Sequence, residues 1–493
     1  MKNKSFLITV VLGILLLAGA CKKQLQEVTY SQLAPDNFLV TEDGIKSVLR
    51  AAYTQEADVQ SQKATKGMIM APEMTTDIMW ETAGADNRQA LQFINYTWDS
   101  QLDWLFGQMW YPMYLAIRDA NSVLDNISKV QISDARKRMY QAEARFVRAI
   151  SYYRLYMLFG PVPLRKTTNG EAAGLARSTD AEIATFIETE LMESLADLPD
   201  PGKEEEYGRG NKGAARAFLC KFYLNTKQWQ KCADGAKQLI DLKYYDLYPT
   251  YANLFRVENE RNKEFMWVRP CYPSAISSGP GNDWMGYVLP VGFAREPVSG
   301  LTYLSNWRNY AAQYRMRDRF FTTFATNDKR RTLVLTSYVN SSGQTVSLLN
   351  NDDTRPLKFW PDPAAIDGGG GNDIPQIRYA DILLSRAEAL NELNGPNTES
   401  IALINQVRQR AGITDITLGS FASKDALRDH LLNERGWEFY CEGIRREDLI
   451  RTGRLITYAK ARGVTNAKDF HVLFPIPQQA LDSDPLVKQN TGY

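Results

Sequence analysis

The segment 133–161 reads SDARKRMYQAEARFVRAISYYRLYMLFGP and carries the clearest helical pattern in the chain. Its apolar side chains recur at spacings of three and four residues, which places them on one face of an α-helix. They are Met139, Ala142, Phe146, Ala149, Ile150, Tyr153 and Met157. Ser133 can cap the start, and Gly160 with Pro161 ends the pattern. We therefore predict a helix over 133–159 with one buried face.

Similar patterns on both sides of this segment group into pairs. We expect helix pairs at 44–60 with 102–128, 133–159 with 180–196, 211–225 with 228–241, and 376–394 with 400–411, and a last helix at 424–441. Two helices joined by a short break, about 34 residues in all, have the size of a tetratricopeptide unit. The expected fold is mostly α, a tetratricopeptide-like scaffold of about four helix pairs.

The span 244–373 has a different character. Aromatic residues, Pro, Gly and Asn dominate it, with short strand-like pieces at 264–269 and 332–338. The four glycines at 368–371 precede no Gly-Lys-Ser/Thr sequence, so we interpret them as a flexible loop and not as a phosphate cradle. We expect an irregular, loop-rich half with short strands. The resulting division is a helical region at 44–243, a ligand-loop region at 244–373 and a C-terminal region at 374–493.

The N-terminus has the features of an export signal. Lys2 and Lys4 precede an apolar run over 6–18, which is shorter than the roughly 20 residues needed to span a bilayer. Small residues then lead to Cys21. We predict a lipoprotein signal at 1–20, lipid attachment on Cys21 and an extended leader over 21–43. The alternative is an ordinary signal peptide followed by an unmodified cysteine.

Charge and cysteine usage exclude several classes of function. The net charge is +1, and removal of the signal takes away Lys2 and Lys4 and leaves −1, so bulk charge predicts no nucleic-acid partner. With two histidines and no CxxC or CxxH spacing, we expect no metal site and no cofactor. Cys220 and Cys232 lie on consecutive predicted helices, either as buried thiols or as a disulfide.

Several stretches resemble the hallmarks of the SusD/RagB outer-membrane lipoproteins. They are AEARFVRA at 142–149 with LFGPVPL at 158–164, IRYADILL at 377–384 with AEA at 387–389, NERGWEF at 433–439 with EGIRREDL at 442–449, and PIP at 475–477 with QNTGY at 489–493. Together with Cys21, these stretches occur in the order typical of that family and cover nearly the whole chain.

The resemblance implies both a fold and a role. Members have four tetratricopeptide-like helix pairs with an irregular half laid on them. They lie at the cell surface of Bacteroidetes, bind oligosaccharides, and act as a lid and partner of a SusC-like TonB-dependent transporter; a few handle peptides. Lys22 and Lys23 replace the acidic cluster often found after the lipid cysteine. The expected location is the outer membrane, lipid-anchored and surface-facing.

The charged residues of these hallmarks have a physical interpretation of their own. Charges of both signs interleave along the predicted helices, which favours ion pairs between helices. They are Glu143, Arg145, Arg378, Glu388, Glu434, Arg435, Glu438 and Arg445. Glu434 and Glu438 share a helix face, but the neighbouring arginines would keep both ionised, which is unsuitable for a general acid. We therefore expect no catalytic residues.

Sugar binding needs flat apolar surfaces for the ring faces and planar polar groups for the hydroxyls, both on loops held by a rigid frame. Two loop regions supply them. The candidate residues are Asp77, Trp80, Asn87, Arg88 and Trp98 in the first, and Asn282, Asp283, Trp284 and Tyr287 in the second. The resemblance implies the region and not the single residues. For each aromatic residue, packing is the alternative.

Three other functions remain to be weighed against a glycan-binding protein. The same architecture could take peptides or another nutrient, since the variable loops decide. A glycosidase would use two carboxylates, for which Asp77 and Asp283 are the candidates. A pure scaffold, as other tetratricopeptide proteins are, would have no need of the long irregular half.

Overall fold

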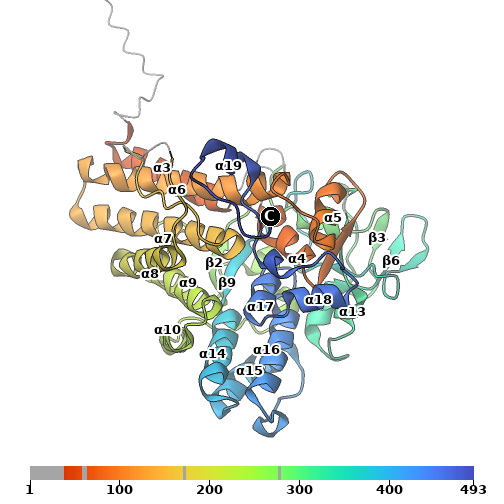
Figure 1. Cartoon of the computed structure of the whole chain (residues 1–493). Coiled ribbons are helices and arrows are strands. Elements are labelled where there is room, and N and C mark those ends of the chain that lie inside the picture. The colour runs from red at the N-terminus through yellow and green to blue at the C-terminus, as the bar shows by residue number, and fades with distance from the viewer. Residues whose placement is uncertain (1–37, 58–63, 170–173, 276–278, 312) are drawn as a thin grey trace, which may run out of the picture.

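The computed structural model describes residues 38–57, 64–169, 174–275, 279–311 and 313–493. Figure 1 shows a stack of helices on one side of the molecule and an irregular part with short strands on the other. The predicted signal at 1–20, Cys21 and most of the leader lie outside the described residues. None of the helices described combines the length and the apolar character needed to cross a membrane.

The helical scaffold consists of the expected pairs. Helix α3 (Glu42–Ala57) packs on α6 (Tyr111–Asn126), α7 (Asp134–Phe159) on α8 (Asp180–Asp197), α9 (Lys212–Asn225) on α10 (Trp229–Asp241), and α14 (Tyr379–Asn394) on α15 (Thr398–Ala411). The prediction of a mostly helical scaffold with four pairs is confirmed for the described part of the chain.

Neighbouring pairs also pack on one another and form a continuous stack. Contacts join α6 to α7, α8 to α9, and α10 to α14, and α16 (Lys424–Phe439) packs on α14. Helices α10 and α14 contact each other although residues 242–378 lie between them in the sequence (Figure 1). Most of the buried apolar side chains of the stack belong to one core that extends into the irregular half, and a smaller cluster lies between α3, α6 and the start of α7.

Local sequence signals set the ends of these helices. The Ser133 hydroxyl accepts a hydrogen bond of 3.4 Å from the Arg136 amide at the start of α7, as predicted. At the start of α8, Thr179 and Glu182 cap each other's amides at 3.2 and 2.7 Å. Gly160 ends α7 with φ +73°, which a side chain would disfavour.

The irregular half contains small antiparallel sheets. Strands β1 (Met79–Thr82) and β4 (Gln313–Met316) pair, as do β2 (Phe265–Arg269) with β9 (Ile374–Arg378), β5 (Val334–Leu335) with β8 (Arg355–Pro356), and β6 (Ser337–Asn340) with both β3 (Phe293–Arg295) and β7 (Thr345–Ser347). The predicted strand at 264–269 is β2. The predicted strand at 332–338 is two strands in the structure, because it covers β5 and the first residues of β6.

The stretch 64–100 is more regular than its sequence suggests. It holds a π-helical turn at Ala64–Met70, the short helix α4 (Ala71–Met74), β1, and the nine-residue helix α5 (Asn87–Asn95). The predicted helix at 102–128 likewise begins as a π-helical turn at Leu105–Trp110, and α6 starts only at Tyr111. These elements are too short for a sequence period to identify them, because each shows its apolar face only two or three times.

The remaining helices are short and lie in the irregular half or near the C-terminus. They are α11 (Tyr251–Leu254), α12 (Trp284–Val288), α13 (Asp318–Phe321), α17 (Arg445–Arg451), α18 (Leu455–Ala461) and α19 (Gln478–Ser483). The last residues return to the middle of the molecule (Figure 1). There the Tyr493 hydroxyl accepts a hydrogen bond of 2.8 Å from Trp98 Nε1.

The hallmark charges form buried ion pairs between elements, as predicted. Arg435 lies between Asp381 and Asp448 at 2.8 and 2.9 Å, and so joins α16, α14 and α17. Arg209 contacts Glu143 at 2.6 Å, and Arg451 contacts Glu388 at 2.7 Å. These pairs connect consecutive layers of the scaffold.

Glu438 is the centre of the largest such network. Although burial alone would raise the pKa of Glu438, the guanidinium groups of Arg410, Arg378 and Arg330 lower it to about 2. Glu438 is therefore ionised at any physiological pH and cannot act as a general acid. Its role is to hold α16 against α15, the end of β9 and the 3-10 helix at Lys329–Leu333, which carry the three arginines.

Candidate functional site

Strands β1 and β4 bring the two predicted ligand regions together. Helix α5 packs on β1, and α12 packs on β4. The pairing of β1 with β4 therefore joins the loops of 77–98 to those of 282–287, which are far apart in the sequence. Figure 1 shows α5 and β1 in the irregular half, beside the helical scaffold. The second region therefore lies next to the sheet that carries Trp80.

Trp80 and Arg315 are directly opposite each other in this sheet. Both point to the partly exposed face, whereas Glu81 and Tyr314 point inward, as the alternation of a strand requires. The Arg315 guanidinium carbon lies 5.1 Å from the centre of the Trp80 ring, a favourable cation–π distance. Trp80 Nε1 donates a 3.0 Å hydrogen bond to the Asp352 carbonyl, which fixes the orientation of the ring.

The start of α5 lies beside the inward face of this sheet, where the charge of Asp86 acts on Glu81, Tyr287 and Tyr314. Asp86 and Asn87 are half-buried, and Arg88 is exposed. Lys66 Nζ lies 3.0 Å from a carboxylate oxygen of Asp86 and so ties this end of α5 to the π-helical turn. We define the Trp80 patch as Trp80, Arg315 and Asp353, whose carboxylate lies 2.7 Å from the Arg315 guanidinium. It combines one aromatic ring with guanidinium and carboxylate groups, as sugar ring faces and hydroxyls require.

Tyrosines support the patch from behind. The ring of Tyr287 lies 4.7 Å from that of Tyr310 and 5.0 Å from that of Tyr314, measured between centroids. Lys66 Nζ lies 5.6 Å from the centre of the Tyr287 ring. Aromatic pairs at these distances stabilise a fixed arrangement. The sequence analysis identified Tyr287 but not Tyr310, Tyr314 or Arg315, because no local pattern distinguishes these three from other loop residues.

Glu81 is buried beneath the patch. It lies beside the Gln313 backbone, but neither carboxyl oxygen makes a well-formed hydrogen bond among the described residues. Burial, reinforced by the charge of Asp86, raises the pKa of Glu81 to about 8. Glu81 is therefore largely protonated at neutral pH and can donate a hydrogen bond.

Trp98 and Trp284 have packing roles, the alternative that the sequence left open. Only 3% of Trp98 is exposed, and its ring centre lies 5.2 Å from that of Phe474. Trp284 is fully buried, and its Nε1 donates a 2.8 Å hydrogen bond to the Pro356 carbonyl. Neither ring presents a face to the surface in this structure, so neither contributes a platform for a sugar.

Asn282, Asp283 and Tyr287 are also buried and lie behind the surface. The Asn282 side chain accepts a hydrogen bond from the Trp284 amide and donates one to the Asn372 carbonyl, each of 3.0 Å. Its backbone pairs with Gly370, which fixes the glycine loop against α12. These residues hold the loop that supports the patch and are not part of its surface.

Asp77 is bound within the protein. Its two carboxylate oxygens accept hydrogen bonds of 2.9 and 2.8 Å from the Arg445 guanidinium. Burial alone would raise the pKa of Asp77, but the Arg445 guanidinium lowers it below its usual value. Asp77 is thus engaged by Arg445, and Asp283 is buried behind the surface. Within the described residues, no group of three or more His, Cys, Asp or Glu side chains is placed to hold a metal ion.

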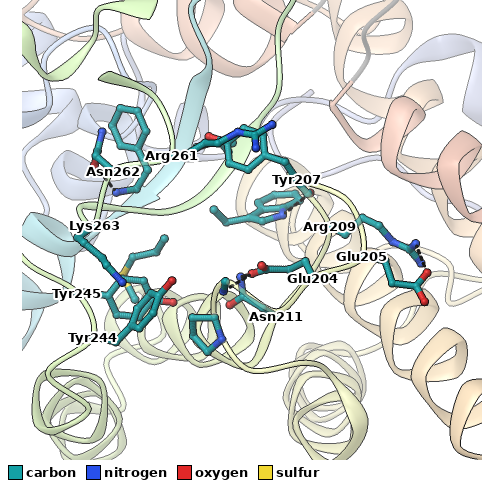
Figure 2. Close-up of a pocket in the computed structure, with 17 residues that line it drawn as sticks. Glu204, Glu205, Tyr207, Arg209, Asn211, Tyr244, Tyr245, Arg261, Asn262 and Lys263 are labelled. Atoms are coloured by element: carbon teal, nitrogen blue, oxygen red, sulfur yellow. Dashed lines mark hydrogen bonds and ion pairs between the residues drawn. The ribbon is translucent and has the colours of Figure 1, made fainter. Parts of the chain in front are cut away.

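A separate pocket of about 500 Å³ lies between the segment 201–211, the end of α10 and strand β2. Figure 2 shows an open space with Tyr244 and Lys263 on one side, Tyr207 and Arg261 on another, and Glu204 below. The sequence analysis did not identify it, because its residues come from three separate segments with no common motif. It is lined on several sides.

The helix-pair scaffold and its loop-built aromatic and polar surface define a class of protein, the helical-repeat binding proteins with an added loop-rich half. The model of the SusD family matches residues 243–493, more than half of the chain. A second model, described as starch-binding associating with outer membrane, matches residues 25–224. The chain belongs to the SusD family.

Relatives and solved structures agree with this assignment. The chain is 25% identical to the SusD-like protein P25 of Formosa agariphila, over 96% of the chain and 97% of that protein. It is 23% identical to the starch-binding protein SusD of Bacteroides thetaiotaomicron, over 85% of the chain and 84% of that protein.

Solved structures support the fold. A laminarin binding SusD-like protein matches with a TM-score of 0.78 at 22% identity, over 92% of this chain and all of that one. The surface glycan-binding protein A of Bacteroides thetaiotaomicron, in complex with laminarihexaose, matches with a TM-score of 0.75 at 19% identity. The match covers 91% of this chain and 99% of that one. At these identities the structures establish the fold and leave the ligand open.

Proposed function

We propose that this protein is a cell-surface binding protein for oligosaccharides and not an enzyme. In this proposal, lipid on Cys21 anchors it to the outer membrane, and it serves as lid and partner of a SusC-like TonB-dependent transporter. Membership of the SusD family supports this role, as do relatives named for starch and laminarin binding. The bound ligand lies on the Trp80 patch.

The pairing of Trp80 with Arg315 carries the proposal for the site. An indole held by a backbone hydrogen bond and one guanidinium is a rigid apolar surface beside polar groups. A sugar ring gains apolar contact on such a surface, and its hydroxyls find Arg315 and Asp353 at the edge. Ordering costs are low because the ring is already fixed.

The experiment is a binding screen with the soluble form, residues 22–493. Affinity gels and calorimetry with plant, host and microbial polysaccharides are run on the wild type, Trp80→Ala and the control Trp229→Ala, whose partly exposed ring lies on α10. We expect binding to one glycan class that weakens at least about tenfold in Trp80→Ala only, roughly 1.4 kcal/mol. A protein that binds peptides and no glycan would refute the oligosaccharide assignment.

The anchor and the partner need their own measurements. Mass spectrometry of the mature protein should find a lipid-modified Cys21 at the N-terminus, and an unmodified cysteine or another cleavage site would refute the anchor. Purification of the native protein from outer membranes should recover a TonB-dependent transporter. Recovery of the protein alone under mild detergent conditions would count against a stable partnership.

A further inference from the structure

The pocket of Figure 2 has features of a binding site that the Trp80 patch does not share. Its volume of about 500 Å³ lies within the range of small-molecule sites. Its walls come from the segment that follows α10, through Tyr244, and from the irregular half, through Trp267 on β2. The Trp267 Nε1 donates a 2.9 Å hydrogen bond to the Gly208 carbonyl, which fixes the wall contributed by the segment 201–211.

Two cations at this pocket are available to a ligand. The Lys263 ammonium lies 3.4 Å from the centre of the Tyr244 ring, and the Arg261 guanidinium lies 4.5 Å from that of Tyr207. Both side chains are exposed, and neither forms an ion pair among the described residues. Each charge is thus placed over a ring and keeps its hydrogen-bond donors free for a ligand.

The carboxylates of the same pocket are already engaged. Glu205 contacts Arg136 at 2.9 Å and Arg209 at 3.3 Å. Glu204 accepts hydrogen bonds from the Gly202 amide, at 3.2 Å, and from the Asn211 side chain. Arg209 in turn is held by Glu143. The partners of Glu204 are neutral, so its charge remains, and the two cations Arg261 and Lys263 against this one carboxylate leave the pocket net positive.

The walls are preformed. The Tyr207 hydroxyl donates a 2.5 Å hydrogen bond to Asp373, which lies on the far side in a separate hollow of about 250 Å³. Gly202 has φ +78°, and a Cβ there would lie 2.4 Å from the Tyr244 hydroxyl oxygen, so only glycine permits the close approach. The Tyr245 hydroxyl is buried at the pocket wall without a hydrogen-bond partner among the described residues.

We propose that this pocket is a second ligand site, separate from the Trp80 patch, and that it takes a sugar bearing a carboxylate, such as a uronic-acid residue. Arg261 and Lys263 bind the carboxylate, and Tyr207 and Tyr244 border the sugar ring. A neutral sugar would leave both cations unmatched and gain only the ring contacts. The site therefore discriminates by charge, and its affinity falls as salt increases.

Calorimetry with trigalacturonate and with neutral galactotriose tests the proposal on residues 22–493. We expect trigalacturonate to bind the wild type, and the double variant Arg261→Gln/Lys263→Gln to weaken binding at least tenfold. Tyr244→Ala should weaken it as well. The matched control Arg319→Gln/Lys460→Gln removes the same charge from exposed residues of the irregular half and should leave the affinity unchanged.

The outcomes separate this site from the Trp80 patch. Trp80→Ala should bind trigalacturonate as tightly as the wild type does. Loss of binding in Trp80→Ala but not in the Arg261/Lys263 variant would overturn the second site and leave the proposed function standing. Equal affinity for galactotriose, or no binding of trigalacturonate, would also overturn it. Circular dichroism of each variant establishes that it is folded.

Discussion

The Arg445 guanidinium donates two hydrogen bonds, of 2.9 and 2.8 Å, to the carboxylate of Asp77. The two residues are 368 positions apart in the sequence. This contact fastens the loop before β1 to the start of α17. Arg445, the first arginine of the EGIRREDL stretch, therefore sets the position of the strand that carries Trp80. The Trp80 patch therefore depends on a residue near the far end of the chain.

Removal of the Asp77 charge should destabilise the protein. In Asp77→Asn, the buried Arg445 guanidinium loses its charged partner, and we expect a loss of about 3 kcal/mol in the free energy of unfolding. Urea unfolding measures it, with the exposed Asp234→Asn on α10 as the control. If stability were unchanged while glycan binding vanished, Asp77 would be a ligand residue after all.

Neutralising Glu438 should have a similar or larger effect. In Glu438→Gln, three buried arginines keep their charges while their shared carboxylate is gone, which should cost about 3 to 5 kcal/mol. Thermal and urea unfolding measure the loss. The control is Glu193→Gln, whose ion pair with Arg145 is half exposed and should contribute below about 1 kcal/mol. A stable, soluble Glu438→Gln protein would contradict the role given to this network.

Glu73 should give the protein a characteristic pH dependence. Burial raises its pKa to about 8 from the ordinary 4.5. Between these values the folded state holds a proton that the unfolded state releases, so this residue makes stability fall as pH rises. Glu73→Gln should remove a slope of up to about 1.4 kcal/mol per pH unit. Unfolding curves between pH 5 and pH 8 measure it, and identical slopes in both proteins would refute the shift.

The two kinds of tryptophan should separate stability from binding. Trp284→Ala removes a fully buried ring and its hydrogen bond and should cost roughly 3 to 5 kcal/mol. Trp80→Ala removes a partly exposed ring and should cost far less stability while weakening glycan binding. Parallel unfolding and binding titrations check this. Equal destabilisation by both changes would place Trp80 in the core.

The thiols should be unreactive in the folded protein. Cys220, Cys232, Cys271 and Cys441 are free and buried, and burial raises their pKa values. We expect a thiol reagent to modify them only after denaturation and a reductant to leave the melting temperature unchanged. Rapid labelling of the native protein, or a lower melting temperature on reduction, would reveal an exposed thiol or the Cys220–Cys232 disulfide.

The helix pairs could be predicted because each long helix repeats its apolar face several times. Helix α7 shows this best, with a cap at Ser133 and a break at Gly160 that the structure reproduces. Helix α5 could not be predicted, since nine residues contain too few repeats of a helical period. The sequence places the candidate ligand residues in two stretches. Which of these residues reach the surface depends on strand alternation in β1 and β4.

The sequence alone determined the family hallmarks, the mostly helical scaffold and the charges of both signs along its helices, because these depend on periodicity and on residue types at fixed positions. Tertiary structure decided the rest. Trp80 and Trp98 look alike in sequence, yet one lies opposite Arg315 at the surface and the other packs against Phe474 in the core. The pocket beside Tyr244 exists only because α10 and β2 meet the segment 201–211. Burial and charge pairing between distant segments depend on the complete fold, and no local pattern encodes them.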